Sequence, residues 1–368
     1  MFDRRLVENF DWGLLGMTLL IGCFGIIILY SAVASGGTFP QKTLFVKQLF
    51  WYTAGLMVMI ASFLINYRYL EKWAHMVYGI SIFFLVAVLI FGKQIGGSRR
   101  WLVFGPVSFQ PSELAKVAVI VVMARYYSKR VSNEGFTWQE LLTPFILMLL
   151  PVLLIVNQPD LGTAILIVLI SGTLMLFAKI ERRSLLFIAL LSCAAVPMVW
   201  FFLKEYQKQR ILTFLNPDRD PLGAGYHIIQ SKIAIGSGMV GGKGFLKGTQ
   251  NALSFLPEHH TDFIFSVLAE EWGFVGSMVV LFIFLFIIFR GLHIAYRCRD
   301  SFGTLLSLGI TAIIFWQVFI NVGMAMGLMP VVGVTLPFVS YGGSSLVTNM
   351  LCVGILINVS MRRFMFEP

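Results

Sequence analysis

Long apolar stretches recur along nearly the whole chain, and within them apolar residues follow one another without the alternation of a barrel strand. An α-helix rises about 1.5 Å per residue, so roughly 20 apolar residues cross the ~30 Å hydrocarbon core of a bilayer. Continuous apolar runs of that length predict membrane-spanning helices. Ten are predicted, at residues 12–34, 45–65, 73–92, 111–128, 139–156, 161–179, 184–203, 263–290, 302–328 and 338–361.

Composition supports the same class of protein. Of 368 residues, 58% are hydrophobic and 12% are charged, whereas soluble domains carry about 25% charged residues. The chain therefore lacks the charged surface that would keep soluble domains of this size dissolved. We predict an all-α polytopic membrane protein with ten transmembrane helices and a single transmembrane domain over residues 1–368.

The distribution of Lys and Arg predicts the orientation of the chain. With the amino terminus in the cytoplasm, fifteen basic residues fall in inner segments and five in short outer ones, leaving out the long connection 204–262. Short cytoplasmic loops of membrane proteins carry such an excess of positive charge. We therefore expect both termini in the cytoplasm. The net charge of +10 is then mostly a topology signal, and because basic runs with interleaved aromatics are missing, no nucleic-acid partner is expected.

The connection 204–262 follows the seventh predicted span and lies on the outer face. It is far longer than ordinary connections, which favours a functional role. Its residues 226–235 (YHIIQSKIAI) predict a short amphipathic helix at the interface. The glycine-rich run 236–241 matches GxGxxG, but a dinucleotide site needs a strand–turn–helix unit that neighbouring spans exclude. A flexible glycine turn is the better interpretation.

Asp262 ends this connection, directly before the apolar run Phe263–Phe265. A carboxylate at the boundary between water and hydrocarbon suits a general base. An Asp before an apolar helix is equally typical of a helix N-cap. The residues alone favour neither alternative.

Charged and small residues mark the outer ends of other predicted spans. Glu113 and Lys116 are three residues apart on one helix face and can pair. Because an unpaired charge costs roughly 2.5–3.5 kcal/mol at the centre of a membrane helix, we expect an ion pair, with a cavity slightly favoured over a purely structural role. Asp160 suits a helix cap and a cavity wall equally.

The segment LPFVSYGGSS at residues 336–345 contains Ser340, Gly342 and Gly343. Small residues let backbones approach closely, so tight packing is the stronger interpretation. Several basic residues face the same outer side as Asp262, and although each alone is typically a solvated loop charge, together they suit a pyrophosphate head group. These residues are Lys47, Arg99, Arg100, Arg210 and Lys243.

Six motifs occur in order along the chain: GGSRRWL (96–102), QPSELAK (110–116), QPDLGTA (158–164), RILTFLNPDRDPLGAGYHIIQSKIAIGSG (210–238), FLPEHHTDFIF (255–265) and LPFVSYGGSS (336–345). With them the chain resembles the SEDS family (shape, elongation, division and sporulation) across all ten predicted spans. HTDFIF and SYGGSS together are highly specific. The short amino terminus and the wording HHTDFIF are more similar to the elongation branch of the family than to the division branch.

The resemblance implies a peptidoglycan glycosyltransferase that joins lipid II units at the outer face of the bacterial inner membrane during cell elongation. It implies as partners a class B penicillin-binding protein, other elongation-complex membrane proteins and the undecaprenyl-linked glycan. The family's essential aspartate falls on Asp262, which shifts the balance there towards catalysis. Its paired glutamate and lysine fall on Glu113 and Lys116, its basic cavity residues on Arg99, Arg100 and Arg210, and a further carboxylate on Asp160.

The expected chemistry is one inverting displacement of undecaprenyl pyrophosphate, for which a single carboxylate base suffices. Arginines or a divalent cation, Mg or Mn, would neutralise the leaving group. The sequence contains no recognisable metal motif, so it assigns no ligands to such a cation. Two other functions remain open: a flippase or transporter for the lipid-linked precursor, and a non-catalytic scaffold for a penicillin-binding protein.

Overall fold

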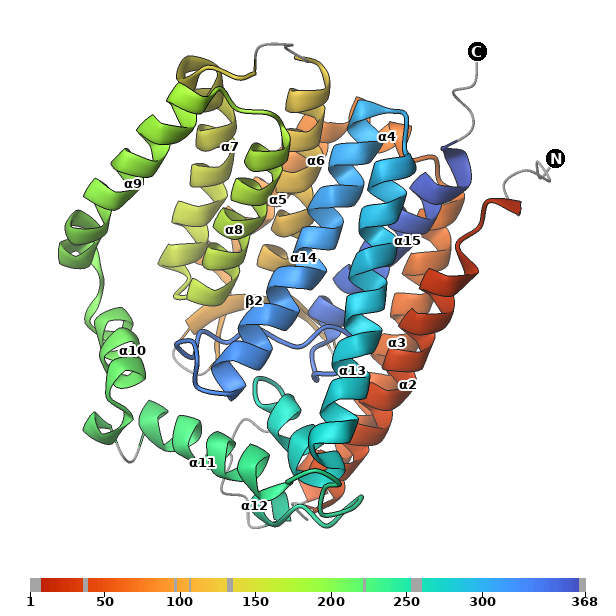
Figure 1. Ribbon diagram of the computed structural model, residues 1–368, viewed down its shortest axis with the longest axis vertical. Coiled ribbons are helices and arrows are strands. Elements are labelled where there is room, and N and C mark those ends of the chain that lie inside the picture. The colour runs from red at the N-terminus through yellow and green to blue at the C-terminus, as the bar shows by residue number, and fades with distance from the viewer. Residues whose placement is uncertain are drawn as a thin grey trace.

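The computed structural model describes residues 8–35, 39–95, 98–105, 107–130, 135–220, 223–252 and 260–363. Long helices form one bundle, with both termini at one end and α11 and α12 at the other (Figure 1). Every predicted span coincides with a helix. These are α2 (Trp12–Ser35), α3 (Phe39–Leu64), α5 (Ala74–Phe91), α6 (Pro111–Ser128), α7 (Trp138–Asn157), α8 (Leu161–Phe177), α9 (Arg182–Phe202), α13 (Ile264–Arg297), α14 (Ser301–Ala325) and α15 (Gly343–Arg362).

Seven helices of the described part are long and apolar enough to cross a membrane: α2, α3, α5, α7, α13, α14 and α15. Among the others, α6 carries three charged residues in its 18, and α8 has only 17 residues. The structure therefore confirms a polytopic helical membrane protein. The count of ten spans stays a prediction.

The prediction of an all-α protein is wrong at residues 93–109. There β1 (Lys93–Ile95), β2 (Ser98–Phe104) and β3 (Val107–Phe109) form an antiparallel sheet in the order β1-β2-β3. Leu102 pairs with Phe109 and Phe104 with Val107. The apolar and aromatic residues of β2 suit a strand. This sheet carries Arg99 and Arg100 to the outer end of α6.

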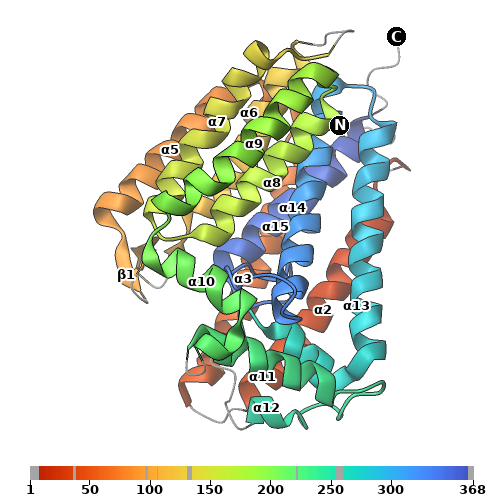
Figure 2. The same cartoon turned by 60° about the vertical axis from the view of Figure 1, so that its left-hand side comes forward.

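The long outer connection is folded rather than open. It contains α10 (Glu205–Leu215), the 3₁₀ turn η1 (Pro217–Arg219), α11 (Ala224–Ser237) and α12 (Thr249–Ala252). The predicted amphipathic helix at 226–235 is confirmed as the middle of α11, which buries Ile228 and Ala234. Together α10 and α11 run from the outer end of α9 along the edge of the bundle (Figure 2).

The glycine run after α11 is a fixed turn that fills a break in α13. Gly273 has φ 65° and ψ −162°, which interrupts the helix. Phe274 N and Val275 N donate to Met239 O and Val240 O at 2.9 and 3.1 Å, and Lys243 N and Gly244 N donate to Glu270 O and Glu271 O at 3.0 and 2.9 Å. Since membrane helices can break only where other groups satisfy the backbone, the turn and the break depend on each other. The expectation of a flexible turn is therefore wrong.

The core lies around α14 and α15. In their most apolar windows 72% and 89% of residues are buried, whereas the corresponding share is 22% in α3 and α5. Thus α15 is the central helix, and the segment leading into it reaches the middle of the outer half of the bundle. That placement brings residues 331–345 next to Asp262.

Candidate active site

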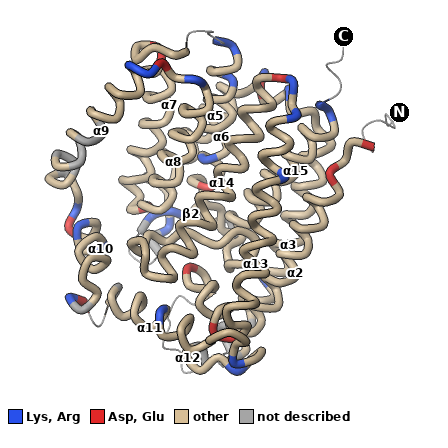
Figure 3. Tube along the Cα trace, viewed as in Figure 1, with Lys and Arg blue, Asp and Glu red and all other residues tan. Residues whose placement is uncertain are grey.

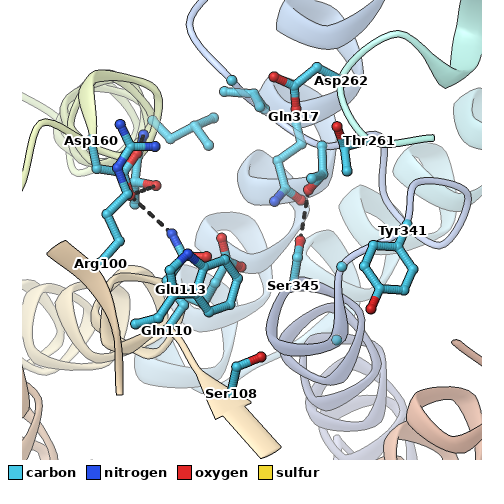
Figure 4. Close-up of a pocket in the computed structure, with 18 of the residues that line it drawn as sticks. Arg100, Ser108, Gln110, Glu113, Asp160, Thr261, Asp262, Gln317, Tyr341 and Ser345 are labelled. Carbon is cyan, nitrogen blue, oxygen red and sulfur yellow. Dashed lines mark hydrogen bonds between the residues drawn. The ribbon is translucent and has the colours of Figure 1, made fainter. Parts of the chain in front are cut away.

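A cavity of about 290 Å³ lies between β2 and the beginnings of α6, α8 and α13. Its wall includes Arg100 from β2, Asp160 from the start of α8 and Asp262 from the turn before α13. Arg100 and Asp160 lie on one side of the cavity, and Thr261 and Asp262 lie on the other (Figure 4). The structure thus brings together polar groups from segments that are far apart in the sequence.

Asp262 lies outside α13. The N-cap position of that helix belongs to the buried Phe263, one residue after Asp262, which does not support the helix-cap interpretation of Asp262. The half-buried Asp262 lines the cavity, and its carboxylate lies over Gly333, where an added Cβ would stand 3.5 Å from Oδ2. A small residue at 333 therefore keeps the space beside the carboxylate open.

Three consecutive carbonyls hold the main chain at Asp262 in place. The carbonyl oxygens of His260, Thr261 and Asp262 accept from Tyr341 N at 2.9 Å, Ser340 Oγ at 2.6 Å and Asn321 Nδ2 at 3.0 Å, respectively. The second amide hydrogen of Asn321 goes to Val334 O at 2.7 Å. A fixed backbone is what a catalytic side chain needs for a constant position.

This bracing assigns roles that the sequence did not. Ser340 is buried and also accepts from Leu336 N at 2.9 Å, so it supports the Asp262 turn and is not part of the cavity lining. Asn321 was missed, although an Asn inside an apolar span is itself a functional signal. Gln317, one helical turn before Asn321, lines the cavity and buries an Oε1 that has no partner among the described residues.

The predicted pair of Glu113 and Lys116 is confirmed. Lys116 Nζ lies 3.0 Å from Oε1 and 2.9 Å from Oε2 of Glu113, and both residues are buried while lining the cavity. A buried charge is tolerated only when a partner of opposite sign compensates its lost hydration. The pair therefore forms a rigid, nearly neutral part of the wall.

Asp160 is both a helix cap and a cavity residue. Its carboxylate accepts from Thr163 N at 3.3 Å, and its Oδ2 also accepts from Ser112 Oγ, Thr163 Oγ1 and Gln110 Nε2 at 3.1, 2.9 and 3.1 Å. These donors are all neutral and come from the two helices that meet at the cavity. Asp160 thus joins the starts of α6 and α8, which favours a shaping role over direct contact with an anionic substrate.

Arg100 and Arg210 bring positive charge to the cavity. The Arg100 guanidinium donates to Gln158 O at 3.3 Å and also to Pro159 O. Arg210, on α10, donates from Nη1 to Val331 O at 3.1 Å. Burial and then the positive charge of Arg100 lower the pKa of Arg210, whereas Asp262 and Asp160 act in the opposite direction. Two cations and two carboxylates therefore share one electrostatic environment.

Four of the predicted basic residues, Arg210 included, are not among the residues that line this cavity. Lys47 on α3 and Arg99 on β2 are exposed and lie outside its wall. Lys243 binds the buried carboxylate of Glu270, with Nζ 2.7 Å from Oε1. The ammonium of Lys243 thus fixes the turn that fills the break in α13, and a substrate-binding role for Lys243 stays a prediction.

The glycines before α15 allow close packing, as expected. A Cβ on Gly343 would collide with the ring of Trp51, and Trp51 itself lines the cavity. Gly342 N donates to Gln48 Oε1 at 3.4 Å. These contacts seat the beginning of α15 against α3 and set one wall of the cavity.

The described residues offer no complete metal cage. They include no group of three or more His, Cys, Asp or Glu side chains close enough to hold a metal ion. Of the three carboxylates that line the cavity, Glu113 is paired with Lys116 and Asp160 accepts from several donors. A cation at this site would therefore need oxygen ligands from the substrate.

Comparison with known sequences identifies relatives over nearly the whole chain. The family model for the cell cycle proteins FtsW, RodA and SpoVE matches residues 11–364. The peptidoglycan glycosyltransferase MrdB of Escherichia coli K12 is 45% identical over 93% of this chain and 92% of its own length. The probable peptidoglycan glycosyltransferase FtsW of Geobacter sulfurreducens is 37% identical over 97% of this chain and 96% of its own length.

Solved structures share the fold. One chain, from a structure on the coordination of polymerization and crosslinking by a peptidoglycan synthase complex, aligns with a TM-score of 0.82 and 33% identity. The alignment covers 96% of this chain and 98% of the length of that chain. The rod shape determining protein RodA of Thermus thermophilus aligns with a TM-score of 0.71 and 29% identity over the same shares.

Proposed function

This chain belongs to the FtsW, RodA and SpoVE family of cell cycle proteins, and we propose that it is the peptidoglycan glycosyltransferase of the elongation type, polymerising lipid II. The observation that carries this proposal is the cavity in which Asp262, on a braced turn, faces Arg100 across the space that a head group would fill. The shared name of the curated relatives supports the reaction class. The greater identity to MrdB supports the elongation branch.

We infer the following roles in the reaction. The Asp262 carboxylate accepts the proton of the acceptor's 4-hydroxyl as that oxygen attacks the anomeric carbon of the donor. The new glycosidic C–O bond forms on the face opposite the leaving group while the bond to the pyrophosphate breaks, so the anomeric configuration inverts. Arg100 and Arg210 stabilise the negative charge that grows on the departing pyrophosphate. Glu113, Lys116 and Asp160 keep the cavity walls in place.

A divalent cation fits this arrangement only when the substrate shares it. Mg²⁺ is commonly held by one or two carboxylates together with substrate phosphates, and Asp262 is the cavity carboxylate that suits this role. When bound, such a cation would neutralise part of the pyrophosphate charge. The roles of the protein's own residues do not depend on it.

We propose the predicted orientation in the bacterial inner membrane, with ten spans, one transmembrane domain and both termini in the cytoplasm. Two features support it: the termini lie at the same end of the bundle, and Lys and Arg gather at that end (Figures 1 and 3). The cavity then opens to the extracytoplasmic side. The likeness to a chain of a synthase complex that coordinates polymerization and crosslinking supports a crosslinking partner of the class B penicillin-binding type.

Replacing Asp262 by Asn tests the catalytic proposal. Loss of a general base slows a reaction roughly 10²–10⁴-fold, and Asp262→Asn keeps the size of the side chain, so the cavity should persist. Polymerisation of labelled lipid II by the purified protein, with and without its partner, should fall by that factor while the melting temperature is unchanged. Undiminished polymer formation would mean that Asp262 is not the base.

The same assay separates the other two functions. A flippase would move lipid II between leaflets of a vesicle without forming polymer. A scaffold would raise the partner's activity equally well with wild-type chain and with Asp262→Asn.

A further inference from the structure

A second polar pocket is formed by helix ends at the end of the bundle that carries the termini (Figure 1). Its volume is about 270 Å³, and its walls come from the end of α6, the residues around Phe136, the end of α8 and the beginning of α14. Lys179 and Arg299 line it, with Ser301 and Thr304 beside them, and no Asp or Glu is among its described lining residues. Its described lining therefore carries two cationic side chains, while the Thr304 hydroxyl already donates to Cys298 O and Asp300 O.

Main-chain hydrogen bonds fix the shape of this pocket. Phe136 N donates to Lys179 O at 3.0 Å, and Glu181 N donates to Phe136 O at 3.2 Å. These bonds clamp the connection before α7 to the connection before α9, and they hold Lys179 at φ 59°. A non-glycine residue in that conformation persists only where the surroundings impose it. Lys179 is therefore held at the rim by the fold.

A buried hydroxyl of this pocket has no hydrogen-bond partner among the described residues. Tyr127 lines the pocket with 2% of its surface exposed, and its OH forms no hydrogen bond with any described residue. Leaving a buried polar group unpaired costs about 1–3 kcal/mol, so a ligand that accepts this hydrogen bond gains affinity. The nearby Asp300 is already engaged, because it accepts from Gly303 N at 3.0 Å and Tyr67 OH at 3.3 Å.

An apolar groove of about 510 Å³ runs beside the pocket towards the middle of the membrane. The last half of α8 and the first two turns of α9 form its sides, and α9 stands at the edge of the bundle (Figures 1 and 2). Its one polar pair in the described part is satisfied, since Trp316 Nε1 donates to Thr173 Oγ1 at 3.0 Å. Leu176 and Ile180 line the groove, and Ile180 directly follows Lys179 in the chain.

The spacing of pocket and groove matches one leaflet of a bilayer. Leu305 lines the pocket and Trp316 lines the groove, both on α14. Eleven residues are about three helical turns, which places the two side chains on the same face and about 16 Å apart along the axis. Half of the ~30 Å hydrocarbon core is about 15 Å. A phosphate in the pocket would thus place an attached acyl chain in the groove.

We propose that the pocket and the groove together bind one anionic phospholipid of the cytoplasmic leaflet. Its phosphodiester lies between Lys179 and Arg299 and accepts the hydrogen bond of Tyr127 OH, while one acyl chain fills the groove between α8 and α9. Basic pockets between membrane helices on the cytoplasmic side are suited to anionic head groups. The choice of leaflet rests on the orientation proposed above, whereas the binding itself does not.

The head-group contacts are tested by lipid retention in native mass spectrometry, after release of the whole protein from nanodiscs that mix phosphatidylglycerol with phosphatidylcholine. The double variant Lys179→Gln, Arg299→Gln should retain phosphatidylglycerol at least about tenfold less than wild type, because charge-assisted contacts are lost. Tyr127→Phe, which removes only the hydroxyl, should lower retention several-fold. The matched control Arg130→Gln, Arg297→Gln removes two basic residues at the same end, outside the pocket, and should retain lipid as wild type does. Equal losses in both double variants would reduce the effect to general surface charge and overturn the proposal.

The acyl chain is tested by filling the groove. Gly172 lines the groove, and a Cβ there would meet nothing within 4 Å, so Gly172→Leu should fold normally and displace the lipid. Gly79→Leu is the control, because Gly79 on α5 has the same open surroundings away from the groove. Unchanged phosphatidylglycerol retention in Gly172→Leu, or full competition by millimolar inorganic phosphate, would identify the ligand as a phosphate without a bound chain and overturn the lipid assignment.

Discussion

At the scale of single residues, the position of Asp262 depends on groups that never touch the substrate. Asn321 Nδ2 joins Asp262 O to Val334 O, and Ser340 holds Thr261 O. These donors come from α14 and from the segment before α15, so Asp262 is fixed relative to two helices at once. A displacement of about 1 Å in a catalytic group can cost 10²-fold in rate, which explains why this short turn is so heavily bonded.

Arg210→Lys should lower the turnover number more than the affinity for lipid II. Lysine keeps the charge but loses the planar fork that binds two phosphate oxygens, and charge on the bridging oxygen develops only as the bond breaks. We expect turnover to fall roughly ten- to a hundredfold, less than the loss typical of removing an oxyanion donor entirely. Turnover and binding constant are measured separately for Arg210→Lys and Arg210→Ala.

Lys208→Ala is the matched control on the same helix and should behave as wild type. Equal losses of turnover and affinity in Arg210→Lys would mean that Arg210 only attracts the anionic lipid. If neither turnover nor affinity falls, Arg210 is an ordinary loop charge that donates to Val331 O.

At the scale of elements, α6 contributes a charged pair where a membrane helix normally has none. Reversing either charge alone, as Glu113→Lys or Lys116→Glu, leaves two like charges buried three residues apart. Breaking a buried pair costs about 3–5 kcal/mol, so each single variant should melt at lower temperature and lose polymerisation. The double variant should recover part of both losses.

Thermal unfolding in detergent and lipid II polymerisation measure this series. Arg125→Glu, at the opposite end of α6, reverses a charge outside the cavity and serves as the control. If the effects of the two single changes simply add in the double variant, the two charges do not act on each other.

The break in α13 at Gly273 can be tested by substitution. Gly273 has a backbone conformation that other residues rarely adopt, and a Cβ there would lie 2.7 Å from Val240 O. Gly273→Ala should therefore cost on the order of 1–3 kcal/mol and displace the turn 239–244. Because Asp262 directly precedes the short first part of α13, polymerisation should fall as well.

Gly241→Ala is the control in the same turn, since a Cβ at Gly241 would meet nothing within 4 Å. The two variants are compared by melting temperature and by proteolysis of the turn. A Gly273→Ala protein as stable and protected as Gly241→Ala would show that the break can straighten without consequence.

The sequence predicted the positions of the elements better than their interruptions. Apolar runs locate the ten long helices of the described part because a helix that spans a membrane must stay apolar over its length. The break at Gly273 was missed because glycine is common in membrane helices and the turn that fills the break lies some thirty residues earlier in the chain. The strands β1 and β3 were missed because a strand of three residues leaves hardly any periodic signal, and β2 was missed because its sequence SRRWLVF does not alternate between polar and apolar residues.

The same limit applies to the site. Glu113 and Lys116 were predictable as a pair, because spacing along one helix determines which side chains can meet. The partner of Lys243 was not, since Glu270 lies on a different element and only the fold brings the two together. Local rules identify chemistry within an element, whereas contacts between elements require the three-dimensional structure.

At the scale of the whole molecule, the proposed orientation places the two ends of α13 on opposite sides of the membrane. Tyr296, near the end of α13, is 88% exposed, and Val240, in the turn that fills its break, is 67% exposed. Val240→Cys should therefore react with a membrane-impermeant thiol reagent added to intact spheroplasts. Tyr296→Cys should react only after the membrane is opened, because the end of the bundle that carries the termini would face the cytoplasm. The background of both variants replaces the four native cysteines by Ala, and labelling is read as a mass shift. Labelling of Tyr296→Cys in intact spheroplasts would reverse the orientation, and the cavity at Asp262 would then open to the cytoplasm, where it could not build an external polymer.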